Sequence, residues 1–461
     1  VGWRFRDFHK RYPLPYYTIY FIAGIFIGTI YSFPLIFTIT VSSILIIICI
    51  LLYYFVFPRL NSILKLSISL NFLVSGIFGI NLQNTRVALN TDPFIDGTNR
   101  VKIVVLEAPS HTGNTTVIRS NLEHLRSTIT VSIYSGDKKL KLSPGDTLVI
   151  NFKKTQLKKS DFGNYYLYLH KSGCKVNNFS GRNLLIDVLT FREKIKDLAS
   201  KRFTEKENLS IFNALILGDK SLLSKKSKES FINAGIMHIL AISGMHTGYL
   251  YSILLVILFP LGNGKISLFF RNSLIICTIW FYAILSGFSE SVIRASIMIS
   301  INLIASIFDK GKISLNTLGA SALIMLVINP LSLYNAGFQL SFMATFSIIV
   351  IYPHLNKIFT IKSRVGVYLW QNLAMSISGT LGTFLISILT FGRFPIYFLL
   401  GNLLAAPLIP IIMVTSFMWL IIPSGTQLES IIFFISDSLI FLLNSIATNV
   451  GALPYSSISL K

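Results

Sequence analysis

Long uninterrupted blocks of apolar residues restrict the folds open to this chain more than any other feature. A helix needs roughly 20 consecutive apolar residues to cross the hydrocarbon core of a bilayer. Only 13% of the residues are charged, about half the share that is usual in a soluble domain. The sequence therefore predicts a polytopic α-helical membrane protein of about 11 spans. The expected spans lie near 16–33, 35–57, 64–82, 236–260, 273–287, 291–308, 314–328, 335–353, 366–390, 396–422 and 429–450.

Residues 84–190 interrupt these blocks with a polar region of different character. Short stretches alternate between apolar and polar residues, separated by turn sequences such as Ser-Pro-Gly-Asp at 143–146. Alternation with period two predicts strands. A small closed barrel of about five strands suits this length, and an oligonucleotide/oligosaccharide-binding (OB) fold is the natural candidate. We expect the strands at 101–108, 115–120, 127–134, 146–153, 164–170 and 183–189.

These changes in composition divide the chain into four predicted parts. Residues 191–235 mix charged residues with apolar ones in a pattern typical of amphipathic helices. The predicted parts are N-terminal membrane helices at 1–83, an inserted all-β domain at 84–190, amphipathic helices at 191–235 and a second membrane domain at 236–461.

Basic residues in the short loops orient the predicted spans, because cytoplasmic loops carry an excess of Lys and Arg. If the N-terminus is cytoplasmic, three spans place the β domain outside. The loops near 288–290 and 329–334 then lie outside and hold no Lys or Arg. The net charge of +22 fits cytoplasmic loops, a polyanionic partner, or both. The loops assigned to the cytoplasm carry Arg59, Lys65, Lys265, Arg271, Lys310, Lys312, Lys357, Lys362 and Arg364.

The β domain is basic, and part of it places lysines close to aromatic residues. Cations that follow phosphates and rings that stack on bases are the usual parts of a groove for single-stranded nucleic acid. The alternative, which residue statistics favour, is a sheet edge protected by lysines with the aromatic rings in the barrel core. The DNA-binding candidates are Lys153, Lys154, Lys158, Lys159, Tyr165 and Tyr166.

Four motifs occur in order along the second half of the chain. The first contains Gly218 and Asp219 and continues into a stretch that reads FINAGIMHILAISGMH. At these separations the motifs closely resemble the competence domain of the ComEC family of inner-membrane DNA-internalisation proteins. Residues 161–166 resemble the extracytoplasmic domain of the same family. The four motifs lie at 214–220 with 231–246, 291–295, 329–342 and 391–407.

The resemblance implies an inner-membrane channel that carries single-stranded DNA into the cytoplasm during natural transformation. Its other partner is the lipid bilayer, and a DNA receptor, a nuclease and a cytoplasmic motor or helicase are expected on other chains. No Gly-x-x-x-x-Gly-Lys-Ser/Thr loop for ATP occurs. The candidates for the channel lining are His238, Ser243, Gly244, His246, Glu290, Arg294, Gln339, Asn402 and Pro407.

Two places in the apolar blocks combine polar side chains with residues that interrupt helices. A break at Ser243 and Gly244 would open the backbone toward a cavity, whereas a continuous helix would put His238 and His246 on one face. Helix packing through small residues is the alternative. Pro395, Pro407 and Pro410 around Asn402 predict a broken or re-entrant segment whose helix N-termini point at phosphates, although kinked packing explains these prolines equally well.

Charged residues inside the spans are few, and their roles stay open. Arg294 follows Glu290 by four residues, so the two can pair on a helix. Because an arginine in a membrane is costly, we expect Arg294 to face water, or else to lock two helices through an ion pair. Gln339 could line a pore or bond across helices, and Asp437 could make a buried polar contact or a contact between protomers.

The sequence predicts no cofactor, no metal site and no catalytic activity. Many members of the family carry a C-terminal metallo-β-lactamase-like domain, which needs a cluster of histidines to hold two metal ions. The seven histidines of this chain are scattered. Because the chain begins with Val1 and ends at Lys461 just after an apolar block, we expect it to be a fragment or a processed form. Alternative functions are a secondary transporter or lipid/polysaccharide handler on the same scaffold, and a membrane-tethered receptor for nucleic acid.

Overall fold

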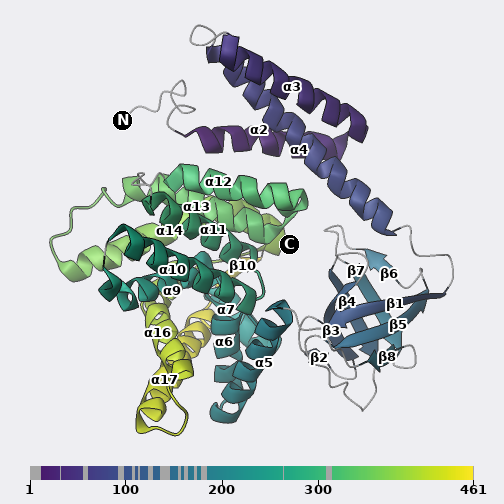
Figure 1. Ribbon diagram of the computed structural model, residues 1–461. Coiled ribbons are helices and arrows are strands. Elements are labelled where there is room, and N and C mark those ends of the chain that lie inside the picture. Colours follow the sequence, from purple (N-terminus) through teal and green to yellow (C-terminus); the bar gives the residue numbers. More distant parts are fainter. Residues whose placement is uncertain are drawn as a thin grey trace. The chain divides into compact units, whose positions relative to one another are not determined.

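The computed structural model of the chain divides into two compact units, which are described separately (Figure 1). Unit 1 comprises 1–194 and 323–334, and unit 2 comprises 195–322 and 335–461. The structure describes residues 12–31, 33–55, 61–91, 98–105, 110–112, 115–122, 128–134, 146–153, 157–159, 165–170, 174–177, 184–262, 264–307 and 314–459.

Unit 1 begins with the apolar helices α2 (Pro13–Ile30), α3 (Leu35–Phe55) and α4 (Asn61–Thr91). Glycines let α2 and α4 approach closely. A Cβ atom added at Gly24 would collide with the carbonyl oxygen of Leu73, and one added at Gly76 would collide with that of Phe21. Small residues at a contact between membrane helices allow such close packing. The two helices therefore touch backbone to backbone.

The polar region forms a mixed sheet whose strands follow the order β6-β7-β4-β3-β1-β5-β8, with β2 paired to β3. The pairs are antiparallel except for β4 and β7, which run parallel. Alternate residues such as Ile103 and Val105 or Val131 and Ile133 are buried and form one core, as expected when one face of a sheet is covered. The strands are β1 (Thr98–Val105), β2 (Ser110–Thr112), β3 (Thr115–Leu122), β4 (Thr128–Tyr134), β5 (Thr147–Lys153), β6 (Leu157–Lys159), β7 (Tyr165–His170) and β8 (Cys174–Asn177).

The strand predictions hold for β1, β3, β4, β5 and β7, within the residues that are described. The strand expected at 183–189 is wrong, because helix α5 (Leu184–Arg202) occupies this stretch. Val188, Arg192, Ile195 and Ala199 are all buried, and their spacing of three or four residues is that of one helix face. The stretch belongs to the helix that follows it. The OB interpretation of the domain stays a prediction.

Unit 2 contains the remaining helices and a small two-stranded sheet (Figure 1). In the order of the chain they are α6 (Lys206–Leu217), α7 (Lys225–Asn233), α8 (Met237–Leu240), α9 (Gly244–Ile257), η4 (Phe259–Leu261), α10 (Lys265–Leu285), α11 (Glu290–Ile307), α12 (Ser314–Ile328), which the unit boundary crosses, α13 (Ala336–Leu355), α14 (Arg364–Phe391), β9 (Arg393–Pro395), α15 (Phe398–Ala405), α16 (Leu408–Ile421), α17 (Gln427–Gly451) and β10 (Ser457–Ser459). The 3-10 helix η5 (Pro330–Tyr334) belongs to unit 1.

Many of these helices have the length and composition of membrane spans. In the described part of the chain, seven helices are long and apolar enough to cross a membrane, or eight if the bent pair α15–α16 is one span. Three shorter apolar helices, Ile36–Cys49, Gly244–Ile257 and Ser314–Ile328, coincide with further expected spans. The chain is therefore a polytopic helical membrane protein, and the number of eleven spans stays a prediction.

Helix α6 lies within the stretch 191–235 that was predicted to form amphipathic helices, and most of it is buried. Nine of its residues are buried, including every residue from Ser210 to Leu217. Phe212 lies in a ring cluster with Phe203 and Trp419. A helix that is buried on all sides belongs to the core. The apolar run of α6 is short, so its composition resembles one face of an amphipathic helix.

Candidate functional site

A break in the chain separates α8 from α9. Ser243 is the N-cap of α9, and its Oγ accepts a hydrogen bond from the backbone N–H of Met245 at 3.3 Å. The backbone N–H of Ser243 donates to Nδ1 of His246 at 3.2 Å. This reciprocal capping box satisfies donors at the start of the helix. The continuous helix through His238 and His246 is therefore wrong, and the alternative of a break at Ser243 is confirmed.

The capping box also fixes the ring of His246. Because Nδ1 accepts a hydrogen bond from the backbone N–H of Ser243, we assign the proton of the neutral ring to Nε2. The side chain is fully buried, and Nε2 has no hydrogen-bond partner in the described structure. His238, by contrast, is exposed at the surface of the protein chain. The two histidines thus have different surroundings.

Arg294 on α11 connects three helices. Its Nη1 donates to the carbonyl oxygen of Ser341 and to Oγ1 of Thr345, both on α13. Its Nη2 lies 2.5 Å from the place where a Cβ atom of Gly244 would stand. A larger residue than glycine at the start of α9 would require this guanidinium to shift. The arginine is 8% exposed, so it is packed inside protein as expected for a charged group in a membrane domain.

Glu290 and Gln339 lie close to the same helices. Glu290 begins α11, and its Cγ is 3.7 Å from the place where a Cβ atom of Gly337 would stand. Asn335 caps α13 and accepts from the backbone N–H of Gly337 at 2.8 Å. Gln339 follows within the first turn of α13 and is half-buried. The structure thus brings Glu290 to the start of the helix that carries Gln339.

The second interruption lies between α15 and α16, which are bent by 40° at Ala406 and Pro407. The carbonyl oxygen of Asn402 accepts from the N–H of Ala406 at 2.8 Å and ends α15, and Pro407 directly precedes α16. The structure shows a bend here, which both a broken segment and kinked packing predict. A Cβ atom added at Gly401 would collide with the carbonyl oxygen of Ala234. This contact brings the broken segment against the loop that leads into α8.

Gly218 and Asp219 form the turn that follows α6. Gly218 adopts a φ of +72°, which favours glycine, and a Cβ atom there would lie 2.5 Å from the carbonyl oxygen of Ser286. Asp219 forms an ion pair with Lys196 at 2.5 Å and accepts from the N–H of Ser221 at 2.9 Å. Burial alone would raise the pKa of Asp219, but Lys196 and Ser221 together lower it to about 2.

Asp219 lies outside the helices long enough to span a membrane, so its ion pair has a testable pH dependence. Its pKa in the folded chain lies below the ordinary value of 3.8. The charged form therefore stabilises the fold above about pH 4, and this contribution of about 2 kcal/mol is lost as the pH falls toward 2. We expect Asp219→Asn to remove most of that acid dependence in urea unfolding of the micelle-bound chain. Asp197→Asn, at an exposed carboxylate of α5, serves as the control and should leave the dependence unchanged.

The DNA-binding candidates of the β domain lie partly together. The register of β6 and β7 pairs Lys158 with Tyr166 and Lys159 with Tyr165. Lys153 lies on β5 opposite Thr98, and Lys154 lies outside the described residues. Four of the six candidates thus occupy two neighbouring strands at one end of the strand order. Their role in binding stays a prediction.

Helix α17 makes polar contacts with α5, α6 and α16, and those of Glu429 were not predicted from the sequence. Glu429 is 5% exposed and accepts from Nε1 of Trp419 at 2.7 Å and from Nη2 of Arg202 at 3.2 Å. Further along α17, Asp437 accepts from Nδ2 of Asn208 at 2.7 Å. The structure therefore shows a half-buried polar contact for Asp437, and a contact between protomers stays a prediction. The eight-residue spacing of Glu429 and Asp437 could have indicated a shared helix face.

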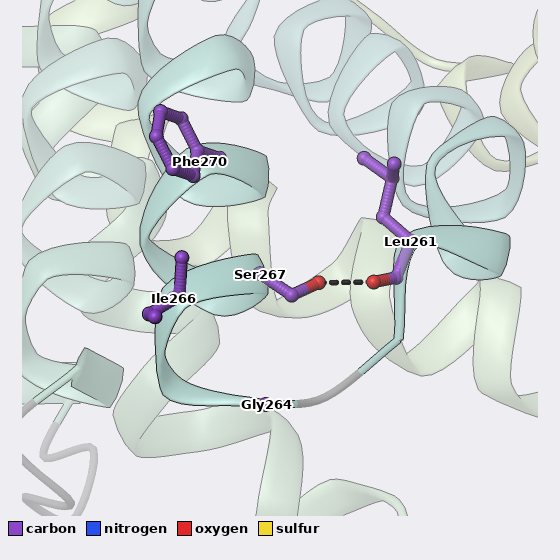
Figure 2. A pocket seen from close by; sticks show the side chains of 5 residues that line it. All are labelled: Leu261, Gly264, Ile266, Ser267 and Phe270. Atoms are coloured by element: carbon purple, nitrogen blue, oxygen red, sulfur yellow. Dashed lines mark hydrogen bonds between the residues drawn. The ribbon is translucent and has the colours of Figure 1, made fainter.

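An apolar pocket of about 700 Å³ lies at the turn between α9 and α10 (Figure 2). Ser267 donates to the carbonyl oxygen of Leu261 across it. Its other lining residues are Gly264, Ile266 and Phe270, and none of the predicted site residues lines it. The large exposed fractions of Ile266 and Phe270, 76% and 65%, indicate a lipid-facing surface. The polar residues at the starts of α9 and α13 are therefore better candidates for a functional site than this pocket.

The chain is similar in sequence to known proteins. A family model described as "Competence protein" matches residues 215–461. ComE operon protein 3 of Bacillus subtilis is 29% identical over 225 residues, which are 49% of this chain and 28% of that protein. The uncharacterized MG316 homolog of Mycoplasma pneumoniae is 28% identical over 35% of this chain and 38% of its own length. An uncharacterized protein of Aquifex aeolicus is 27% identical over 36% of this chain and 40% of its own length.

The matched part covers less than half of each of these relatives. No solved structure matches the chain. In the part of the chain that the structure describes, no group of three or more His, Cys, Asp or Glu side chains is arranged to hold a metal ion.

Proposed function

The chain belongs to the competence protein family, and from this premise we propose that it forms an inner-membrane channel for single-stranded DNA. The strand passes into the cytoplasm, with the N-terminus on the cytoplasmic side and the β domain outside. The membrane domain supplies the path, and other chains supply the DNA receptor, the nuclease and the motor or helicase. The proposal rests on the family and on the two helix interruptions of the membrane domain, before α9 and before α16.

The observation that carries the proposal is the contact in unit 2 between α15 and the loop before α8, each of which leads within a few residues to a helix interruption. The loop before α8 lies against α15 at Gly401, and α15 ends at the bend with α16. In a membrane, interrupted backbone is tolerated only where protein or water surrounds it. A hydrated path is what a phosphodiester chain needs, because its charges are too costly to expose to lipid. The lining then draws on His238, Ser243, His246, Asn402 and Pro407.

The β domain supports a guiding role. Its basic excess and the pairing of Lys158 and Lys159 with tyrosine positions suit a surface that holds single strands. Weak contacts suffice, because a strand in transit must be released at each step. We place this domain at the mouth of the channel and assign it no catalytic step.

Cells that lack this chain are expected to bind external DNA normally and to bring none of it into the cytoplasm. Labelled DNA that becomes resistant to external nuclease measures uptake, and transformation frequency measures delivery. Restoring the gene should restore both. Normal transformation without the chain would reject the channel. Cysteine accessibility through 236–250 and 391–410 during uptake then identifies the residues that meet water.

An ion-coupled transporter on the same scaffold is less well supported. Such a protein usually needs membrane carboxylates that are free to exchange ions. Asp437 accepts a hydrogen bond from Asn208, and Glu290 lies beside the start of α13. If neutralising both carboxylates abolished an ion-coupled flux while DNA uptake continued, the transporter would replace the channel.

A further inference from the structure

The guanidinium of Arg294 lies in a place that favours an anion. It lies against Gly244, the first residue of α9, where the helix dipole is positive. Its hydrogen-bond partners on α13, the carbonyl oxygen of Ser341 and the hydroxyl of Thr345, are neutral. Its Nε has no hydrogen-bond partner in the described structure. Two positive groups buried side by side are costly unless a negative group compensates them.

The neighbouring face of α9 offers a second unused polar group and open space. Gly244, Thr247 and Gly248 share one helix face by their spacing. Thr247 is fully buried, and its Oγ1 has no partner in the described structure. A Cβ atom added at Gly248 would meet no heavy atom within 4 Å. The face therefore carries a buried hydroxyl without a partner, and it is open at Gly248, one turn from the end that Arg294 contacts.

We propose that Arg294 and Thr247, at the N-terminal end of α9, bind a phosphodiester group of the nucleic-acid strand. The inference rests on the proposed channel function and names one of its contact points. The ligand must bring acceptor atoms and negative charge, because the unused groups are the Nε–H of Arg294 and a threonine hydroxyl. A phosphodiester supplies both. A single arginine holds one phosphate without trapping the polymer, which suits a strand that moves on.

Oligonucleotide binding to the whole chain tests this site. The purified chain in maltoside micelles, free of phospholipid, is titrated with fluorescent oligothymidylate over a range of salt concentrations. We expect Arg294→Gln to weaken binding about tenfold or more, because a hydrogen-bonded charge is lost. The slope of log affinity against log salt should fall by about 0.7, the value for one phosphate of a single strand. Arg294→Lys keeps the charge and should keep the slope.

A second variant leaves Arg294 untouched. Gly248→Leu fills the open space one helical turn from Gly244 and should weaken binding by a similar factor without a loss of folding, since leucine is the better helix former. Gly264→Leu is the matched control, because an added Cβ there also meets no heavy atom within 4 Å. It lies at the start of α10 and should bind as the unchanged chain does. Thermal unfolding of each sample confirms its fold.

The outcomes separate this site from the channel itself. If Arg294→Gln and Gly248→Leu both keep affinity, salt slope and cellular uptake, the site is overturned and the channel stands. If the unchanged chain binds no oligothymidylate and cells without it transform normally, both proposals fail. If phosphatidylglycerol in mixed micelles displaces the oligonucleotide from the unchanged chain, but no longer does so from Arg294→Gln, the site belongs to a lipid headgroup and the assignment to nucleic acid is wrong.

Discussion

Gly401→Ala is expected to destabilise the membrane domain by about 3 kcal/mol or more and to abolish DNA uptake. The added Cβ would collide with the backbone carbonyl oxygen of Ala234 and would lie 3.1 Å from Cγ2 of Ile236. Backbone cannot rotate away as a side chain can, so the loop before α8 and the start of α15 must separate. Urea unfolding in micelles measures the stability, and nuclease-resistant DNA measures uptake.

Gly379→Ala is the matched control. Gly379 also lies inside an apolar helix, α14, but a Cβ there would meet only Cδ1 of Ile348, at an ordinary 3.8 Å. Alanine is the better helix former by about 1 kcal/mol, so this variant should be unchanged or slightly more stable. Equal stability and uptake in both variants would mean that the contact between α15 and the loop before α8 does not exist in the membrane.

Glu429→Ala is expected to cost about 1–3 kcal/mol of stability, the usual loss when a buried hydrogen-bond donor is left without its partner. The change leaves Nε1 of Trp419 as a buried donor and releases the guanidinium of Arg202. That guanidinium also lies 5.2 Å from the ring centroid of Phe433. The packing of α5 against α17 should therefore loosen with the pair. Urea unfolding midpoints measure the loss.

Two further variants identify the cause. Glu429→Gln keeps an acceptor for the indole of Trp419 and should lose less stability than the alanine variant. Glu229→Ala changes an exposed glutamate of α7 and should have little effect. Should the alanine and glutamine variants of Glu429 unfold at the same urea concentration as the unchanged chain, the network contributes nothing to stability.

Hydropathy and local alternation predicted much of the fold, because both report on the immediate surroundings of a stretch of chain. The apolar blocks coincide with helices, and most expected strands are present. The helix over 184–189 was missed because apolar residues that begin a helix resemble a short strand. The burial of α6 was missed because sequence does not show how many sides of a short helix are covered.

The candidate site was predictable only in part. The break at Ser243 had a local signal, since a serine N-cap with a partner three residues on is a helix start. The approach of Arg294 to Gly244 joins residues about fifty positions apart, and no local pattern contains it. The pairing of Glu429 with Arg202 is likewise set by tertiary packing. Most residues of the site were identified from the sequence, whereas the tertiary structure determines which of them are in contact.

The burial of α6 from Ser210 to Leu217 has a consequence for how a passage could widen. A helix surrounded by protein has no lipid contact to exchange for water and no free side along which to slide. We therefore expect this part of α6 to keep its position while other helices rearrange. Widening falls to the perimeter, where α9 and α16 each begin at an interruption of the backbone.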